Sequence, residues 1–137
     1  MNSGAKRRDI VIDTSIAWAV ANHRMQKALR RFFGALREEY IVCYTEHTLV
    51  ELAATGYSGF LMRSILDSIA GYRKTGITRD RITRYKAAAR IGPNDVAIAL
   101  VASYYNAVLA TGDWHQASYF MSLSKAKPLY IPVKSLP

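Results

Sequence analysis

The sequence is poor in the residues that build disulfide frameworks and zinc sites. Cys43 is the only cysteine, so no internal disulfide can form and no cysteine cluster is available for zinc. The three histidines, His23, His47 and His115, are scattered without HxxxH or similar spacing, which argues against a zinc enzyme. A Gly-rich phosphate loop and a nucleophilic serine motif are also absent. Any chemistry must therefore rest on other side chains.

Long hydrophobic runs are missing too. No apolar run approaches the roughly 20 residues that a membrane-spanning helix needs. Basic residues precede the first apolar stretch, but Asp9 and Asp13 interrupt that stretch, so it is not a signal peptide. Half of the 137 residues are hydrophobic, which predicts one globular domain over 1–137, with 1–8 flexible. We expect a cytoplasmic protein that makes no contact with a membrane.

Negative charge is scarce as well. Nineteen Lys and Arg stand against ten Asp and Glu, which gives a net charge of +9. A small domain this basic is expected to bind a polyanion, with RNA or DNA the first expectation and a membrane surface the second. The densest basic stretch contains Tyr85, and cations with an aromatic ring suit a nucleic-acid strand. A solvated surface explains the same charges, and this alternative stays open. The candidate RNA-binding residues are Arg79, Arg81, Arg84, Lys86 and Arg90, with Lys27, Arg30 and Arg31 in an earlier helix.

Four of the ten acidic residues lie in apolar surroundings. Asp13 and Asp113 each follow a short apolar run that is typical of a buried parallel strand. Asp95 opens an apolar helix, and Glu51 lies in a helix that follows a third strand. Ligands of an open parallel sheet bind beyond the carboxyl ends of its strands. Since charges rarely sit among apolar neighbours unless they are paired or bind a metal, a shared site is indicated.

Each carboxylate also has a purely structural interpretation. Asp13 can cap the helix after it, and Asp95 can interact favourably with a helix N-terminus. Asp113 with Gln116 matches a D-x-x-Q variant of the capping box, and Glu51 can simply face water. The joint pattern favours a site, because a hard divalent ion such as Mg²⁺ or Mn²⁺ prefers oxygen ligands.

Strands alternate with helices along the chain, which predicts an α/β fold without internal repeats. Pro132 should confine the last strand to an edge of the sheet. Thr45 is a good candidate N-cap, and Gly92-Pro-Asn94 reads as a break and a cap. The expected strands are 10–12, 41–44, 107–111 and 129–133. The expected helices are 14–20, 22–39, 45–56, 59–72, 81–90, 95–105 and 114–122.

Four short motifs occur in an order and spacing that resemble the PIN-domain nucleases, over nearly the whole chain. The resemblance implies a single PIN-like α/β domain, with a twisted parallel β-sheet flanked by α-helices. It also implies one pocket in which Asp13, Glu51, Asp95 and Asp113 are the catalytic and metal-binding residues, with Mg²⁺ or Mn²⁺ as cofactor. Ser15 and Thr111 would be supporting hydroxyls beside this cluster. The motifs are Ile10-Val-Ile-Asp13-Thr-Ser, Leu49-Val-Glu51-Leu, Asn94-Asp95-Val-Ala-Ile-Ala and Leu109-Ala-Thr111-Gly-Asp113.

The resemblance implies cleavage of single-stranded RNA by a metal-activated water. Small members of this kind are often VapC-like toxins, so it also implies an antitoxin partner and a homodimer. One departure is Trp114-His115 after the last aspartate, where many members carry a polar residue and then an aromatic one. Two alternatives stay open: a PIN-like nuclease of rRNA maturation or RNA decay, and a non-catalytic RNA-binding PIN module.

Overall fold

The computed structural model describes residues 7–21, 26–54, 67, 71–73, 92–125 and 127–131. Within these residues, five strands form one sheet in the order β3-β2-β1-β4-β5. All four pairings are parallel. The strands are β1 (Arg8–Ile12), β2 (Tyr40–Thr45), β3 (Gly71–Arg73), β4 (Val108–Thr111) and β5 (Leu129–Tyr130). The expected α/β class with a parallel sheet is thus confirmed.

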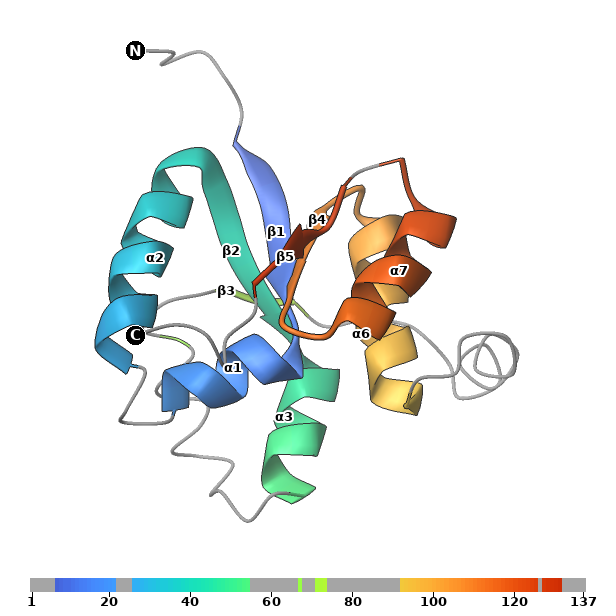
Figure 1. The fold of residues 1–137 in the computed structure, drawn as a ribbon, viewed down its shortest axis with the longest axis horizontal. Helices are drawn as coiled ribbons and strands as arrows, with labels where there is room; N and C mark the ends of the chain where they lie inside the picture. The colour runs from blue at the N-terminus through green and yellow to red at the C-terminus, as the bar shows by residue number, and fades with distance from the viewer. Residues whose placement is uncertain are drawn as a thin grey trace.

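The five described helices lie on both faces of the sheet and at its carboxyl edge (Figure 1). Two helices, α1 and α2, cover one face, while α6 and α7 cover the other. Helix α3 packs against α1 and α6. The bounds are α1 (Thr14–Ala21), α2 (Gln26–Glu39), α3 (Glu46–Ala54), α6 (Pro93–Tyr104) and α7 (Trp114–Leu123). No helix among the described residues is long and apolar enough to cross a membrane.

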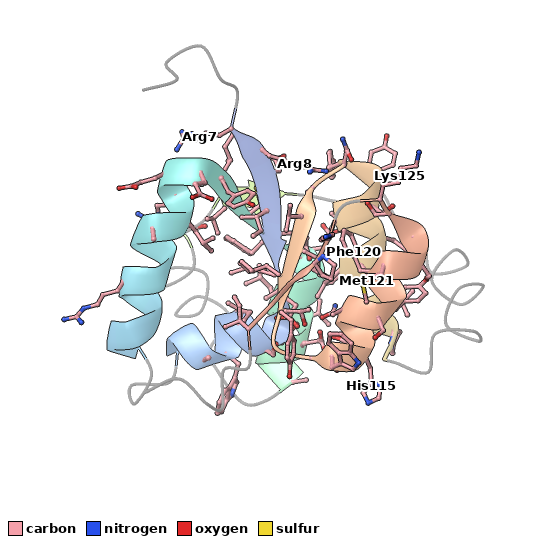
Figure 2. All side chains as sticks on the ribbon, turned by 45° about the horizontal axis from the view of Figure 1, so that its top comes forward. Arg7, Arg8, His115, Phe120, Met121 and Lys125 are labelled. Atoms are coloured by element: carbon pink, nitrogen blue, oxygen red, sulfur yellow. The ribbon has the colours of Figure 1, made fainter. Side chains whose placement is uncertain are left out.

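The amino edge of the sheet is held by two arginines. Arg8 is the first residue of β1, and its guanidinium donates to the main-chain oxygen and the side-chain oxygen of Asn106 at 3.0 and 3.2 Å. Arg7 donates to the main-chain oxygen of Arg37 at 2.7 Å. Figure 2 shows Arg7 and Arg8 at one end of the molecule and His115 at the other. Strand β1 thus begins at Arg8, two residues earlier than expected, while 1–6 lies outside the described residues.

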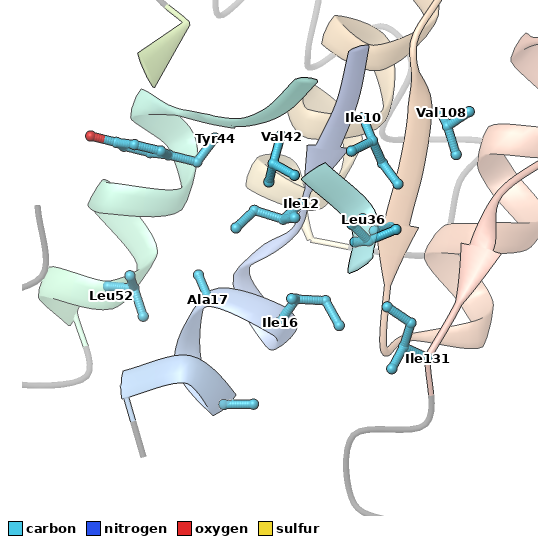
Figure 3. Close-up of a cluster of buried hydrophobic side chains, with 12 residues drawn as sticks. Ile10, Ile12, Ile16, Ala17, Leu36, Val42, Tyr44, Leu52, Val108 and Ile131 are labelled. Carbon is cyan, nitrogen blue, oxygen red and sulfur yellow. The ribbon is translucent and has the colours of Figure 1, made fainter. Parts of the chain in front are cut away.

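Both faces of the central strand β1 are buried. Ile10 and Ile12 pack with α1 and α2, including the side chain of Ile16, in the cluster drawn in Figure 3. Val11 points to the opposite face and packs with Ile98 of α6 in a second cluster. Burial on both sides explains why the strand sequence is an uninterrupted β-branched run rather than an alternating pattern.

One expected helix boundary was wrong. The spacing of apolar residues predicted a helix over 59–72, but Gly71–Arg73 is strand β3. Cys43 of β2 lies in register with Gly71, and Thr45 with Arg73. This pairing joins segments far apart in the sequence, so the spacing of apolar residues within 59–72 could not predict it. The rest of that range, apart from residue 67, lies outside the described residues, as does the expected helix over 81–90.

One expected cap was confirmed and the other in position only. Thr45 directly precedes α3, but its buried hydroxyl has no hydrogen-bond partner among the described residues, so it makes no side-chain cap. Gly92-Pro-Asn94 does hold a cap, because Gly92 is the N-cap of α6, but the helix begins at Pro93, which places Asn94 inside the first turn. Proline suits this position because its missing N–H is one that the helix would leave unpaired. The final strand is confirmed at the sheet edge, although β5 ends at Tyr130 rather than near 133.

The packing of α6 gives a direct test of the fold. Ile98 is fully buried between α6 and the sheet, so Ile98→Ala should lower the free energy of unfolding by about 2–5 kcal/mol. Val50 on α3 is 59% exposed, and Val50→Ala should change it by no more than about 0.5 kcal/mol. Urea unfolding of both variants measures the difference. Equal stabilities would contradict the placement of α6 in the core.

Candidate functional site

Asp13 is a nearly completely buried carboxylate at the carboxyl end of β1, with 1% of its surface exposed. Its main-chain N–H donates to the oxygen of Ala110 at 3.0 Å, which extends the β1–β4 pairing by one residue. The N–H of Ile16 donates to Oδ1 at 3.0 Å, so Asp13 does cap α1. The Ser15 hydroxyl lies 2.7 and 2.8 Å from the two carboxylate oxygens, and the Thr111 hydroxyl donates to Oδ2. The two expected supporting hydroxyls thus both contact this carboxylate.

The four expected acidic residues share one electrostatic environment. The pKa of Asp95 is raised from 3.8 to about 7, first by burial and then by the negative charges of Glu51, Asp13 and Asp113. Burial also raises the pKa of Asp13 from 3.8 to about 6, against the opposing effect of its hydrogen bonds. The negative charges of Glu51, Asp13 and Asp113 thus all act on Asp95.

Glu51 does not simply face water. It is partly buried on α3, and its Oε1 accepts a hydrogen bond of 2.6 Å from the hydroxyl of Thr14, the first residue of α1. The neighbouring His47 has its pKa lowered, mainly by burial. Its imidazole is therefore neutral at pH 7 and adds no positive charge to the site.

Asp113 caps α7, but not through a capping box. Its Oδ1 accepts from the N–H of His115 at 2.9 Å. In a capping box the side chain of Gln116 would reach back to the N–H of Asp113. That N–H instead donates to the Thr111 hydroxyl at 3.0 Å. The capping interpretation of Asp113 was therefore right, and the role expected for Gln116 was wrong.

Gln116 is fully buried and joins three elements of the site. Its amide nitrogen donates to the main-chain oxygen of Asp95 on α6 at 3.0 Å. Its Oε1 lies 2.9 Å from the hydroxyl of Thr111, which also contacts Asp13. Gln116 thus ties the first turn of α6 to the end of β4. The sequence offered one signal, a polar residue one turn after Asp113, and that signal has a second interpretation as a cap.

The donor set fits a hard divalent cation. Among the described residues none of the four carboxylates forms an ion pair, so no basic side chain in that part of the chain relieves their mutual repulsion. No three Asp, Glu, His or Cys side chains in that part of the chain stand in a ready-made metal cage. Mg²⁺ does not need one, because it keeps several waters and takes only one or two protein carboxylates. Oxygen ligands, with no ion-pair partner among the described residues, agree with that chemistry.

Most of the expected RNA-binding side chains are not among those that the structure describes. Arg31 is exposed on α2. Lys27 and Arg30 also lie on α2, while the side chains of these two are not among those described. The basic stretch 79–90, with Arg79, Arg81, Arg84, Lys86 and Arg90, lies outside the described residues.

Comparison with solved structures identifies the fold. PAE2754 from Pyrobaculum aerophilum is similar over 98% of this chain and 93% of its own, with a TM-score of 0.58 and 18% identity. VapBC2 from Rickettsia felis, solved with a DNA fragment from their promoter, is similar over 87% and 96%, with a TM-score of 0.58 and 19% identity. No protein-family model and no curated protein matches the sequence. The chain has a VapC-like PIN fold, as the four motifs led us to expect.

The raised pKa of Asp95 makes a prediction about stability. Between about pH 4 and 7 the folded protein holds a proton on Asp95 that the unfolded chain has lost, so the free energy of unfolding falls as pH rises. In Asp95→Asn this contribution disappears. His47, whose pKa is lowered, acts in the opposite direction below its ordinary pKa, but it does so in both proteins.

The measurement is urea unfolding of wild type and Asp95→Asn across this pH range in the presence of a chelator. The wild type should lose stability relative to the variant with each step in pH. Parallel curves would show that Asp95 titrates as an ordinary solvated carboxylate.

Proposed function

We propose that this protein is a Mg²⁺- or Mn²⁺-dependent endoribonuclease that hydrolyses phosphodiesters of single-stranded RNA. The observation that carries the proposal is Asp95, a carboxylate whose pKa is raised to about 7, first by burial and then by the negative charges of Glu51, Asp13 and Asp113. A divalent cation relieves that repulsion. When bound, it also supplies a water of lowered pKa and offsets charge on the phosphate.

The chain's own residues hold and orient the ligands. Asp13, Glu51, Asp95 and Asp113 would bind the cation directly or through water. Ser15 and Thr111 fix both oxygens of Asp13, and the Thr14 hydroxyl fixes Glu51. Restraint of this kind matters because groups outside the coordination sphere orient the ligands by hydrogen bonds. Mutation of such a group typically lowers metal affinity or activity by about 10- to 100-fold.

The biological setting we infer is a toxin–antitoxin pair. The similarity in fold to VapBC2 favours an antitoxin protein as partner and a toxin role for this chain. A homodimer in the cytoplasm fits the same setting. Processing of rRNA or decay of RNA would use the same chemistry, while a non-catalytic RNA-binding module would have no need for four clustered carboxylates.

Asp113 distinguishes a metal ligand from a helix cap. Asparagine caps helices about as well as aspartate, so Asp113→Asn should preserve α7. Without metal, its stability should equal or exceed that of the wild type, because one like charge is removed. RNA cleavage should fall by orders of magnitude, since an amide is a poorer ligand for a hard cation. Added Mg²⁺ should raise the Tm of the wild type more than that of the variant.

The matched control is Asp9→Asn in β1, a carboxylate at the amino end of the strand. It should leave both cleavage and the Mg²⁺-dependent rise in Tm unchanged. Asp13→Asn and Asp95→Asn should reproduce the loss of cleavage. Full activity in all three asparagine variants would end the nuclease proposal.

The basic stretch has its own test. If Arg81 and Arg84 contact RNA phosphates, replacing both with glutamine should weaken binding and flatten the dependence of log affinity on log salt. The slope should change by about 0.7 for each lost contact with a single strand. Filter binding of RNA across a salt series in chelator measures it. An unchanged slope would assign these arginines to a solvated surface.

A further inference from the structure

Two exposed aromatic rings flank the carboxylate site. Trp114 is 54% exposed and Tyr130 is 42% exposed. Their ring centroids lie 5.5 Å apart and the ring planes meet at 75°, an edge-to-face pair. Such a contact holds both rings in fixed orientations and leaves ring surface open to solvent. Nothing in the carboxylate chemistry requires this pair.

Both rings are tied to residues of the site. Trp114 directly follows Asp113, as the first residue of α7. Tyr130 is the register partner of Thr111, the residue whose hydroxyl contacts Asp13. The N–H of Ile131 donates to the oxygen of Thr111 at 2.8 Å, which fixes β5 at this position. Adjacent strands lie about 4.8 Å apart, so the backbone at Tyr130 is within one strand spacing of the site.

We propose that Trp114 and Tyr130 form a subsite that binds an unpaired base of single-stranded RNA by stacking. This rests on the function proposed above, because it assumes that the phosphodiester next to that base enters the carboxylate site. Every base has a π-face, so aromatic side chains bind bases with little dependence on sequence. An uncharged ring face also suits a position beside acidic residues, where a basic residue would pair with them instead.

The size of the pair favours a base over a protein surface. A stable protein interface buries about 800 Å² on each partner, far more than two rings supply. One base needs no more than a ring face and its edge-to-face neighbour. A protein partner on the same rings is an outcome that the experiment must separate.

A second ring pair in this chain provides a matched control. Tyr104 and Tyr105 also meet edge to face, with centroids 5.1 Å apart. Tyr104 is 73% exposed at the end of α6, beside Asn106 and therefore at the amino edge that Arg8 holds. Tyr104→Ala removes an exposed ring of the same kind away from the carboxylates.

The experiment measures RNA binding without cleavage. In chelator, a short labelled oligoadenylate is titrated with protein and followed by fluorescence anisotropy. Trp114→Ala and Tyr130→Ala should each weaken binding by about 5- to 150-fold. Binding within about twofold of the wild type is expected for Trp114→Phe and Tyr130→Phe, because each keeps an aromatic ring at the subsite. The same is expected for Tyr104→Ala, because it leaves the subsite unchanged. Thermal unfolding confirms that every variant is folded.

Direct contact is read from tryptophan emission. In a Trp18→Phe background Trp114 is the remaining tryptophan, and unlabelled oligoadenylate should quench it. An abasic strand of equal length and an RNA duplex should quench it much less. Equal affinity of both alanine variants and the wild type would overturn the proposal, as would equal quenching by the abasic strand. Loss of self-association in Trp114→Ala by light scattering, with unchanged RNA affinity, would overturn it in favour of a protein interface.

These outcomes separate the subsite from the nuclease. If the wild type binds oligoadenylate through Trp114 but cleaves no RNA with Mg²⁺ or Mn²⁺, the nuclease proposal fails and the stacking subsite remains. If the wild type cleaves RNA and both alanine variants bind and cleave equally well, the subsite fails and the nuclease remains.

Discussion

The contact between Thr111 and Asp13 is the interaction on which the site depends. A carboxylate with 1% of its surface exposed is costly unless donors surround it. Ser15 and Ile16 supply donors from α1, while Thr111 supplies one from β4, so the contact spans two strands and a helix. The Thr111 hydroxyl also accepts from the main-chain N–H of Asp113 and lies 2.9 Å from Oε1 of Gln116. One hydroxyl therefore joins Asp13 to Asp113, while Gln116 beside it donates to the main chain of Asp95.

Helix capping and the proposed cation site look like rival explanations in the sequence. The structure makes them compatible. Asp13 and Asp113 cap α1 and α7, and Asp95 lies in the first turn of α6. Because helix N-termini carry partial positive charge, they stabilise nearby carboxylates by about 0.3–1 kcal/mol each. The parallel sheet directs these helix N-termini to one edge (Figure 1). The offset is incomplete, since the pKa of Asp95 still rises to about 7.

Sequence alone predicted the parts of this fold that depend on local pattern. The β-branched run at 10–12 indicated a strand buried on both faces, and the residue after it was correctly placed at the sheet edge. Pairings between distant segments were not predictable in this way. Strand β3 exists because it pairs with β2, and Glu51 is held by Thr14, 37 residues away. The spacing of Gln116 from Asp113 suggested a capping residue. Its burial depends on how α7 packs, which the sequence pattern did not reveal.

The distribution of charge constrains how a nucleic acid can approach this edge. Arg7, Arg8 and Lys125 lie at the opposite end of the molecule from His115 (Figure 2). A basic side chain beside the four carboxylates would pair with them, lower the pKa of Asp95 and compete with a divalent cation for the same oxygens. Neutral rings such as Trp114 and Tyr130 have no such effect. Under the proposed function, a strand that enters the acidic site would be held there through its bases.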